Sequence, residues 1–117
     1  MGGRTNYEAG CAAEGAVARR YEQAGHRIAD RRWRGHGAEI VLIAEDGDGF
    51  IFVEVKKSVS FARAAERLTR AQMERIYRAA SGYISRSPLG QLANVRFDVA
   101  LVDGSGQIEI VENAFGH

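Results

Sequence analysis

The sequence predicts a single α/β domain in which helices cover a central mixed five-stranded sheet. Three observations predict it: apolar runs typical of strands, two long segments with apolar residues at helical spacing, and glycine-containing turns between these segments. The chain has 117 residues, of which 45% are hydrophobic and 26% are charged, as in ordinary globular proteins. This length favours one domain spanning residues 1–117.

The elements are expected in the order helix, three strands, helix, two strands. The first helix is expected to begin at Asn6, a common capping residue, and to end at Gly25. The second and third strands are apolar on both faces, which favours the middle of a sheet, with the two helices on opposite faces. The expected strands are 26–34, 39–44, 50–56, 95–102 and 107–112, and the second helix is 69–85.

Cysteine content and the N-terminal residues favour a cytoplasmic protein. Cys11 is the single cysteine, so no disulfide can form within the chain, and the first residues lack the apolar core of a signal peptide. The longest apolar run, near residues 50–53, is far shorter than the roughly 20 residues that span a bilayer. No membrane partner is expected.

Basic and acidic residues are segregated along the chain. Lys and Arg gather in residues 1–36 and 50–96, whereas residues 37–49 and 97–117 carry acidic residues and no Lys or Arg. A basic surface beside an acidic pocket would suit a protein that binds phosphates and a divalent metal. The alternative is that these charges are simply solvated faces of helices.

Glu54 and Lys56 are unusual, because these two charged residues end a predicted strand that is otherwise apolar. Side chains two residues apart leave a strand on the same face, roughly 6.5 to 7 Å apart. A carboxylate beside an ammonium suits phosphodiester hydrolysis, in which the carboxylate holds Mg²⁺ or Mn²⁺ and the amine acts at the attacking water. The alternative is an exposed strand end with a loose ion pair.

Two further carboxylates are candidates for the same site. In a simple hairpin register, Glu39 on the preceding strand would lie at the same open end as Glu54. Glu14 on the first helix could add another carboxylate, although a glutamate on a helix is usually solvated. The candidate catalytic residues are therefore Glu54, Lys56, Glu39 and Glu14, with Glu54 and Glu39 as metal ligands.

Arginines form two candidate strips for phosphate contacts. Around Trp33, the arginine side chains could bind phosphate while the indole stacks on an unpaired base, or Trp33 could fill the core. A second basic stretch belongs to the second helix. The candidate nucleic-acid-binding residues are Arg31, Arg32, Arg34, Arg70, Arg75 and Arg78, with Arg19 and Arg20 as further basic residues on the first helix.

Several short motifs together resemble the YraN-like family of small uncharacterised bacterial proteins. The motifs are Glu14 before an alanine-rich helix, Gly25-x-x-Ile28, Trp33-Arg34, Gly37-Ala-Glu-Ile40, Phe52-Val-Glu-Val-Lys56, Arg96-Phe-Asp-Val99 and Asn113-Ala-Phe115. They cover nearly the whole chain. That family is similar to Holliday-junction resolvases and PD-(D/E)xK nucleases, which implies a restriction-endonuclease-like fold, metal-dependent DNA cleavage and a candidate homodimer. The resemblance places Glu14, Glu54 and Lys56 on the helix glutamate and the E-x-K of this pattern.

Val41 is the main departure from that pattern, because the resemblance places a metal-binding aspartate there. Valine cannot ligate a metal, so Mg²⁺ or Mn²⁺ is expected to bind weakly. Glu39 lies two residues earlier on the same strand and could replace the missing ligand. Gln72, where the resemblance implies a lysine, and Lys57-Ser58, where it implies Thr-Arg, are further departures that could shift a phosphate contact but would not abolish chemistry.

Three functions remain open from the sequence. The first is a metal-dependent endonuclease acting on structured DNA, such as branched DNA, with cleavage impaired by Val41. The second is a non-catalytic nucleic-acid-binding protein on a nuclease scaffold. The third is a protein-interaction module, which leaves the pairing of Glu54 with Lys56 unexplained.

Overall fold

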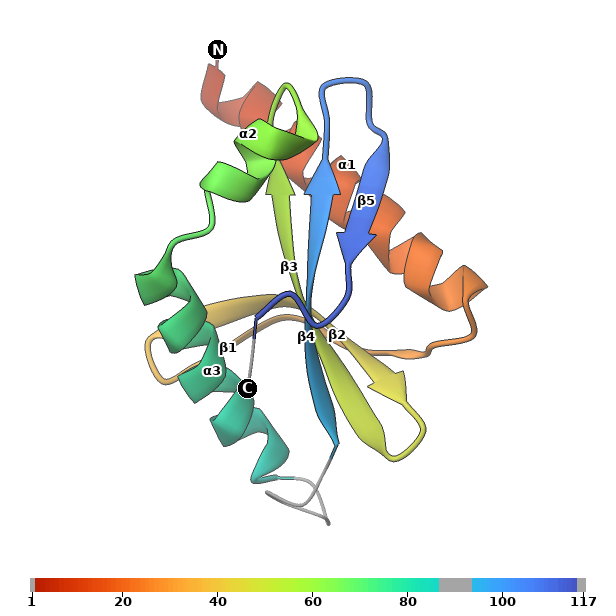
Figure 1. Cartoon of the computed structure of the whole chain (residues 1–117), viewed down its shortest axis with the longest axis vertical. Coiled ribbons are helices and arrows are strands. Elements are labelled where there is room, and N and C mark those ends of the chain that lie inside the picture. The colour runs from red at the N-terminus through yellow and green to blue at the C-terminus, as the bar shows by residue number, and fades with distance from the viewer. Residues whose placement is uncertain (1, 87–93, 116–117) are drawn as a thin grey trace.

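The computed structural model describes the backbone of residues 2–86 and 94–115 and the side chains of residues 10–86 and 94–115. Within these residues, Figure 1 shows one sheet lying between helices. The helices are α1 (Gly2–Gln23), α2 (Phe61–Glu66) and α3 (Arg70–Ile84). The strands are β1 (Ile28–Gly35), β2 (Ala38–Asp46), β3 (Gly49–Lys57), β4 (Val95–Val102) and β5 (Ile108–Val111).

The five strands form one mixed sheet in the order β1-β2-β3-β4-β5. Strands β3 and β4 are parallel, and the other neighbouring pairs are antiparallel. A parallel pair needs a crossover connection, which here contains α2 and α3. The expected mixed five-stranded sheet is confirmed, as is the interior position of β2 and β3.

Helices α1 and α3 cover opposite faces of the sheet, as expected. Val17, Ala18 and Tyr21 of α1 pack with apolar residues from β2, β3 and β4 in one buried cluster. Ile76 and Ala80 of α3 pack with the residues of the other face in a second cluster, which also includes Ala64 of α2. Burial of these two apolar layers is the main stabilising contribution to the fold.

The boundaries of the helices differ from the expectation in two places. Helix α1 begins at Gly2, so the expectation that Asn6 caps it is wrong, whereas Gly25 follows its end with a φ of 96°. Helix α2 was not expected; its N-terminus is capped by Ser60, whose hydroxyl oxygen accepts from the N–H of Arg63 at 3.2 Å. No helix in the described part of the chain is long and apolar enough to cross a membrane.

The pairing of β2 with β3 ends before the C-terminal end of β3. The last paired residues are Leu42 and Val53, whereas β3 stays paired with β4 as far as Lys57. The side-chain alternation of β2 breaks at the same point, because Ile40 packs on the α3 side and both Val41 and Leu42 pack on the α1 side. In Figure 1, β3 and β4 run on together past the region where β2 turns away. The sheet therefore opens at this end.

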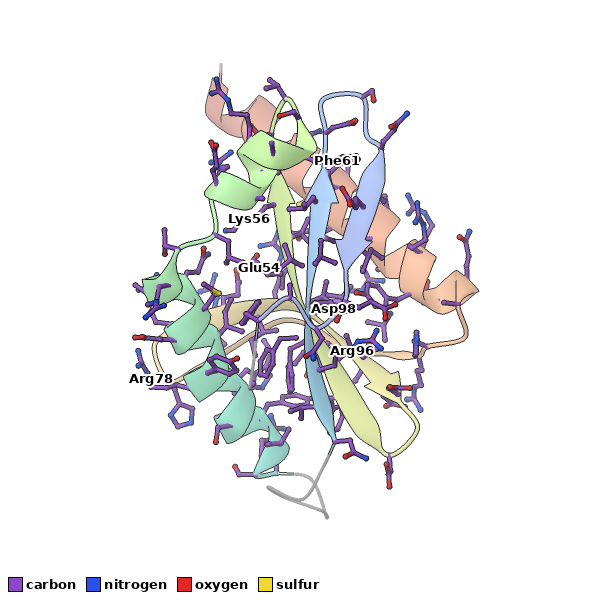
Figure 2. All side chains as sticks on the ribbon, viewed as in Figure 1. Glu54, Lys56, Phe61, Arg78, Arg96 and Asp98 are labelled. Atoms are coloured by element: carbon purple, nitrogen blue, oxygen red, sulfur yellow. The ribbon has the colours of Figure 1, made fainter. Side chains whose placement is uncertain are left out.

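The side chain of Asp98 on β4 is buried and connects several elements of the fold. Its side chain is 0% exposed and accepts hydrogen bonds from the hydroxyl of Tyr21 at 2.6 Å and from the guanidinium of Arg96 at 2.9 and 3.0 Å. The backbone N–H of Asn113 also donates to it, at 2.9 Å. Asp98 thus joins α1, β4 and the C-terminal segment, and Figure 2 shows Arg96 beside it.

Replacing Asp98 with alanine is expected to lower the free energy of unfolding by about 3 kcal/mol or more, because it leaves a buried hydroxyl and a guanidinium without their acceptor. Urea unfolding followed by circular dichroism measures the change. The control is Asp48→Ala, which alters an exposed aspartate in the turn between β2 and β3. Equal, small losses for both variants would contradict the structural role of Asp98.

Candidate functional site

A cavity of about 390 Å³ lies where the sheet opens between β2 and β3. It brings together all four candidate catalytic residues, which come from α1, β2 and β3. Helix α3 closes another side of the cavity with Gln72, Arg75 and Ile76. The charged and polar residues that line it are Glu14, Glu39, Glu54, Lys56, Gln72 and Arg75.

Glu54 is held on the α3 side of this cavity by its neighbours. Its side chain is 7% exposed, and one carboxylate oxygen accepts from the N–H of Val55 at 2.9 Å while the Nζ atom of Lys56 lies 4.0 Å away. The amide nitrogen of Gln72 lies 3.5 Å from the other oxygen, at the limit of a hydrogen bond. Burial raises the pKa of Glu54, and the charge of Lys56 opposes that rise. Figure 2 shows Glu54 and Lys56 on β3 near α2 and α3.

On the α1 side, Arg32 joins the two other candidate carboxylates. Its guanidinium lies 2.6 Å from Glu14 and 3.8 Å from Glu39, and Arg34 donates to Glu39 at 3.2 Å. Burial raises the pKa of Glu14, and the charge of Arg32 opposes that rise, while Glu14 raises the pKa of Arg32. Arg32 and Arg34, expected to contact phosphates, are therefore engaged by acidic side chains in this structure.

Trp33 and Arg31 differ from these two arginines. Trp33 is partly buried and packs against the α3-side core, with its ring edge-to-face to Tyr83 at 5.3 Å between centroids, as the core alternative expects. Arg31 is exposed and forms no ion pair with a described residue. It is the member of this strip whose guanidinium is free to contact a phosphate.

The expected simple register between Glu39 and Glu54 is wrong. Glu39 pairs with Arg34 of β1, and pairing between β2 and β3 has ended before Glu54 is reached. Strand alternation directs Glu39 toward α1 and Glu54 toward α3, in keeping with the contacts that each makes. The two carboxylates meet the same cavity only because the sheet opens there.

The carboxylates as placed do not fit a divalent metal. Among the described residues, no group of three or more His, Cys, Asp or Glu side chains could hold a metal ion. Val41, at the position where the resemblance implies an aspartate, is partly buried against the α1-side core. Arg32 and Lys56 already place positive charge beside Glu14, Glu39 and Glu54. These cations occupy the electrostatic role that a metal would have.

The arginines of α3 form the outer margin of the site. Arg75 lines the cavity, whereas Arg70 and Arg78 are exposed and do not line it. Figure 2 places Arg78 on the outer side of α3, away from Glu54. Only Arg75 of this group can therefore reach a ligand in the cavity, and the other two can contact a ligand that extends over α3.

Two basic residues near the site were not among the candidates. Lys57 and Arg67 line a second cavity beside Lys56. Lys57 directly follows the Glu54-x-Lys56 motif, so its place in the sequence could have made it a candidate. Arg67 could not have been found in this way, because it follows α2, which was not expected.

The fold and this cavity define the class of protein: a mixed α/β protein with a charged cavity at the open end of its sheet. Comparison with known proteins identifies its family. The uncharacterised protein family UPF0102 matches residues 13–102. The chain is 61% identical to a UPF0102 protein of Cereibacter sphaeroides over 98% of both chains, and 56% identical to one of Ruegeria pomeroyi over 98% of this chain and 94% of the relative. The chain belongs to the UPF0102 family.

Replacing Glu54 with glutamine is expected to stabilise the protein at neutral pH. Because burial raises the pKa of Glu54 in the folded state, that state binds a proton more tightly than the unfolded state does. The free energy of unfolding of the wild type therefore falls as the pH rises from the usual glutamate pKa of 4.5 through the raised folded value. Urea unfolding at a series of pH values measures the difference between wild type and variant.

Glu74→Gln is the matched control for this measurement, because Glu74 is exposed on α3. It should leave the pH dependence of the wild type unchanged. The outcome that would contradict a destabilising buried carboxylate is a Glu54→Gln variant no more stable than the wild type at any pH above 4.5.

Proposed function

We propose that this chain binds the phosphate backbone of nucleic acid, and of DNA in particular, at the cavity between β2 and β3. The observation that carries the proposal is the half of the site on β3: a buried carboxylate, Glu54, beside the ammonium of Lys56. The Lys56 side chain is 18% exposed and faces the cavity, so its ammonium is available to an anion. A lysine of this kind binds phosphate as a point charge.

We propose further that the chain has the restriction-endonuclease-like fold. The support for this assignment is the resemblance of the sequence to nuclease motifs, together with the position of Glu54-x-Lys56 at the end of a central strand. The sheet opens beside this motif, and α1 supplies Glu14 to the same cavity. These features support the analogy with nucleases, although a fold by itself does not determine an activity.

A basic surface around the cavity supports nucleic acid as the ligand. Arg75 lines the cavity, Lys57 and Arg67 lie beyond Lys56, and the exposed Arg70 and Arg78 continue this surface over α3. Such side chains bind the phosphate backbone through charge and carry no sequence information. We therefore propose binding that depends little on base sequence.

Cleavage is proposed to be slow or absent, with Mg²⁺ or Mn²⁺ bound weakly. Val41 offers no ligand, and Arg32 neutralises Glu14 and Glu39. Mg²⁺ in particular demands near-octahedral oxygen ligation. The chain then acts as a nucleic-acid-binding protein on a nuclease scaffold.

A metal-dependent endodeoxyribonuclease is the second candidate, and one observation favours it. Glu14, Glu39 and Glu54 line a single cavity, so a movement of Arg32 would leave three carboxylates facing the same space. Glu39 would then replace the missing aspartate. Cleavage of labelled DNA by the wild type that EDTA abolishes would favour this candidate over a binding protein.

Fluorescence anisotropy with branched, duplex and single-stranded DNA tests the proposed binding. Affinity should fall steeply between about 50 and 200 mM salt, because binding releases counterions from the phosphates. Arg75→Gln should reduce the slope of log affinity against log salt by about one. Arg27→Gln is the control, because Arg27 is exposed in the loop between α1 and β1, does not line the cavity and should have no effect. Undetectable binding at low salt, or equal losses in both variants, would overturn the proposal.

A further inference from the structure

A second cavity, of about 490 Å³, adjoins the site and has a different charge. It lies between α1, the end of β3 and the residue that follows α2, and Figure 1 shows α2 near the N-terminal part of α1. Its charged lining within the described residues is Lys56, Lys57, Arg67 and Glu14. Three cations therefore surround this space with one acidic side chain.

The single acidic group does not balance these cations. Glu14 contacts Arg32 at 2.6 Å, so its charge is already engaged. Neither Lys57 nor Arg67 forms an ion pair with a described acidic residue. Lys56 lies 4.0 Å from Glu54, so Lys57 and Arg67 are the two cations of this cavity that no described carboxylate pairs with. Their charges repel each other, and a bound anion would relieve that repulsion.

Arg67 is held in place by a contact that leaves donors free. Its Nη1 atom donates to the backbone carbonyl of Lys57 at 3.0 Å, which joins the end of α2 to the end of β3. An arginine has five N–H donors, so its remaining donors can bind an oxyanion. A planar guanidinium beside a lysine ammonium suits the tetrahedral oxygens of a phosphate.

Helix α1 leaves the space for such a ligand. Gly10 lines the cavity, and a Cβ atom added there would meet no atom within 4 Å. A larger side chain at this position could therefore fill the cavity without removing any charge.

The two cavities adjoin each other. Both are lined by Glu14, Val55 and Lys56, so Lys56 stands between them. A nucleic-acid strand with one phosphate beside Glu54 and Lys56 would bring its neighbouring phosphate toward Lys57 and Arg67.

We propose that Lys56, Lys57 and Arg67 form a second phosphate-binding subsite, which accepts the phosphate next to the one held beside Glu54. This inference rests on the proposed function. The ligand is a phosphate ester, supplied either by an internal phosphodiester of a strand or by the terminal phosphate of a strand end. The subsite would fix the orientation of a bound strand, because it lies on only one side of the cavity that holds Glu54.

The experiment compares three variants of the full chain: Lys57→Gln, Arg67→Gln and Gly10→Leu. Isothermal titration calorimetry measures binding of inorganic phosphate, and fluorescence anisotropy measures binding of a short single-stranded oligonucleotide with a 5′-phosphate or a 5′-hydroxyl. Loss of one charged hydrogen-bond donor should lower phosphate affinity about tenfold. Lys57→Gln should also reduce the salt slope for the oligonucleotide by about one.

Matched controls separate the subsite from general effects of charge and bulk. Arg63→Gln removes an exposed charge from α2 outside the cavity lining, and Ala12→Leu places the same leucine side chain as Gly10→Leu at an exposed position of α1. Thermal unfolding checks that each variant folds. Lys57→Gln keeps the backbone carbonyl that Arg67 contacts, so it tests the subsite even where Arg67→Gln is unstable.

The outcomes distinguish this inference from the proposed function. Losses confined to the three cavity variants support the subsite, and a preference for the 5′-phosphate then identifies a strand end as the source, whereas equal affinity identifies an internal phosphate. Oligonucleotide binding that Arg75→Gln weakens but the cavity variants do not would overturn the subsite alone. Phosphate binding without any oligonucleotide binding would overturn the proposed function and leave an anion site.

Discussion

The charged cavity depends on the point where β2 stops pairing with β3. Beyond Leu42 and Val53 the two strands separate, while β3 remains supported by its parallel pairing with β4. Glu54 can therefore stay rigidly placed on a central strand while Glu39 follows β2 toward α1. A regular hairpin would have closed this space with paired backbone and with side chains in simple alternation.

Arg32 determines what the opened cavity can hold. It lies on β1 between residues paired with Ile40 and Leu42, and its backbone has a φ of 50°, a conformation that costs an arginine about 1 to 3 kcal/mol. Its contacts with Glu14 and Glu39 keep two carboxylates from gathering unpaired. The positive charge of the protein itself thus balances the acidic side of the cavity, and Lys56 does the same for Glu54.

Local patterns in the sequence were sufficient for most of the fold. Apolar residues on both faces of β2 and β3 correctly placed these strands inside the sheet, and the helical spacing in α1 and α3 correctly placed the helices on opposite faces. Helix α2 has six residues, too few to show a helical period, so its capping residue Ser60 was the one local signal.

The candidate site was less accessible to sequence reasoning. The same-face placement of Glu54 and Lys56 follows from strand geometry alone. The separation of Glu39 from Glu54 does not, because it depends on where two strands stop pairing. The partner of Arg32 also lies 18 residues away on another element.

Isothermal titration of Mn²⁺ into the wild type, Val41→Asp and the double variant Val41→Asp with Arg32→Gln tests most directly whether the protein's own cations neutralise the carboxylates of the cavity. The double variant should bind Mn²⁺ most tightly and the wild type most weakly, since it gains a carboxylate and loses the competing cation. If the wild type binds Mn²⁺ as tightly as the double variant does, and Glu39→Ala abolishes that binding, the proposed neutralisation of the carboxylates is contradicted.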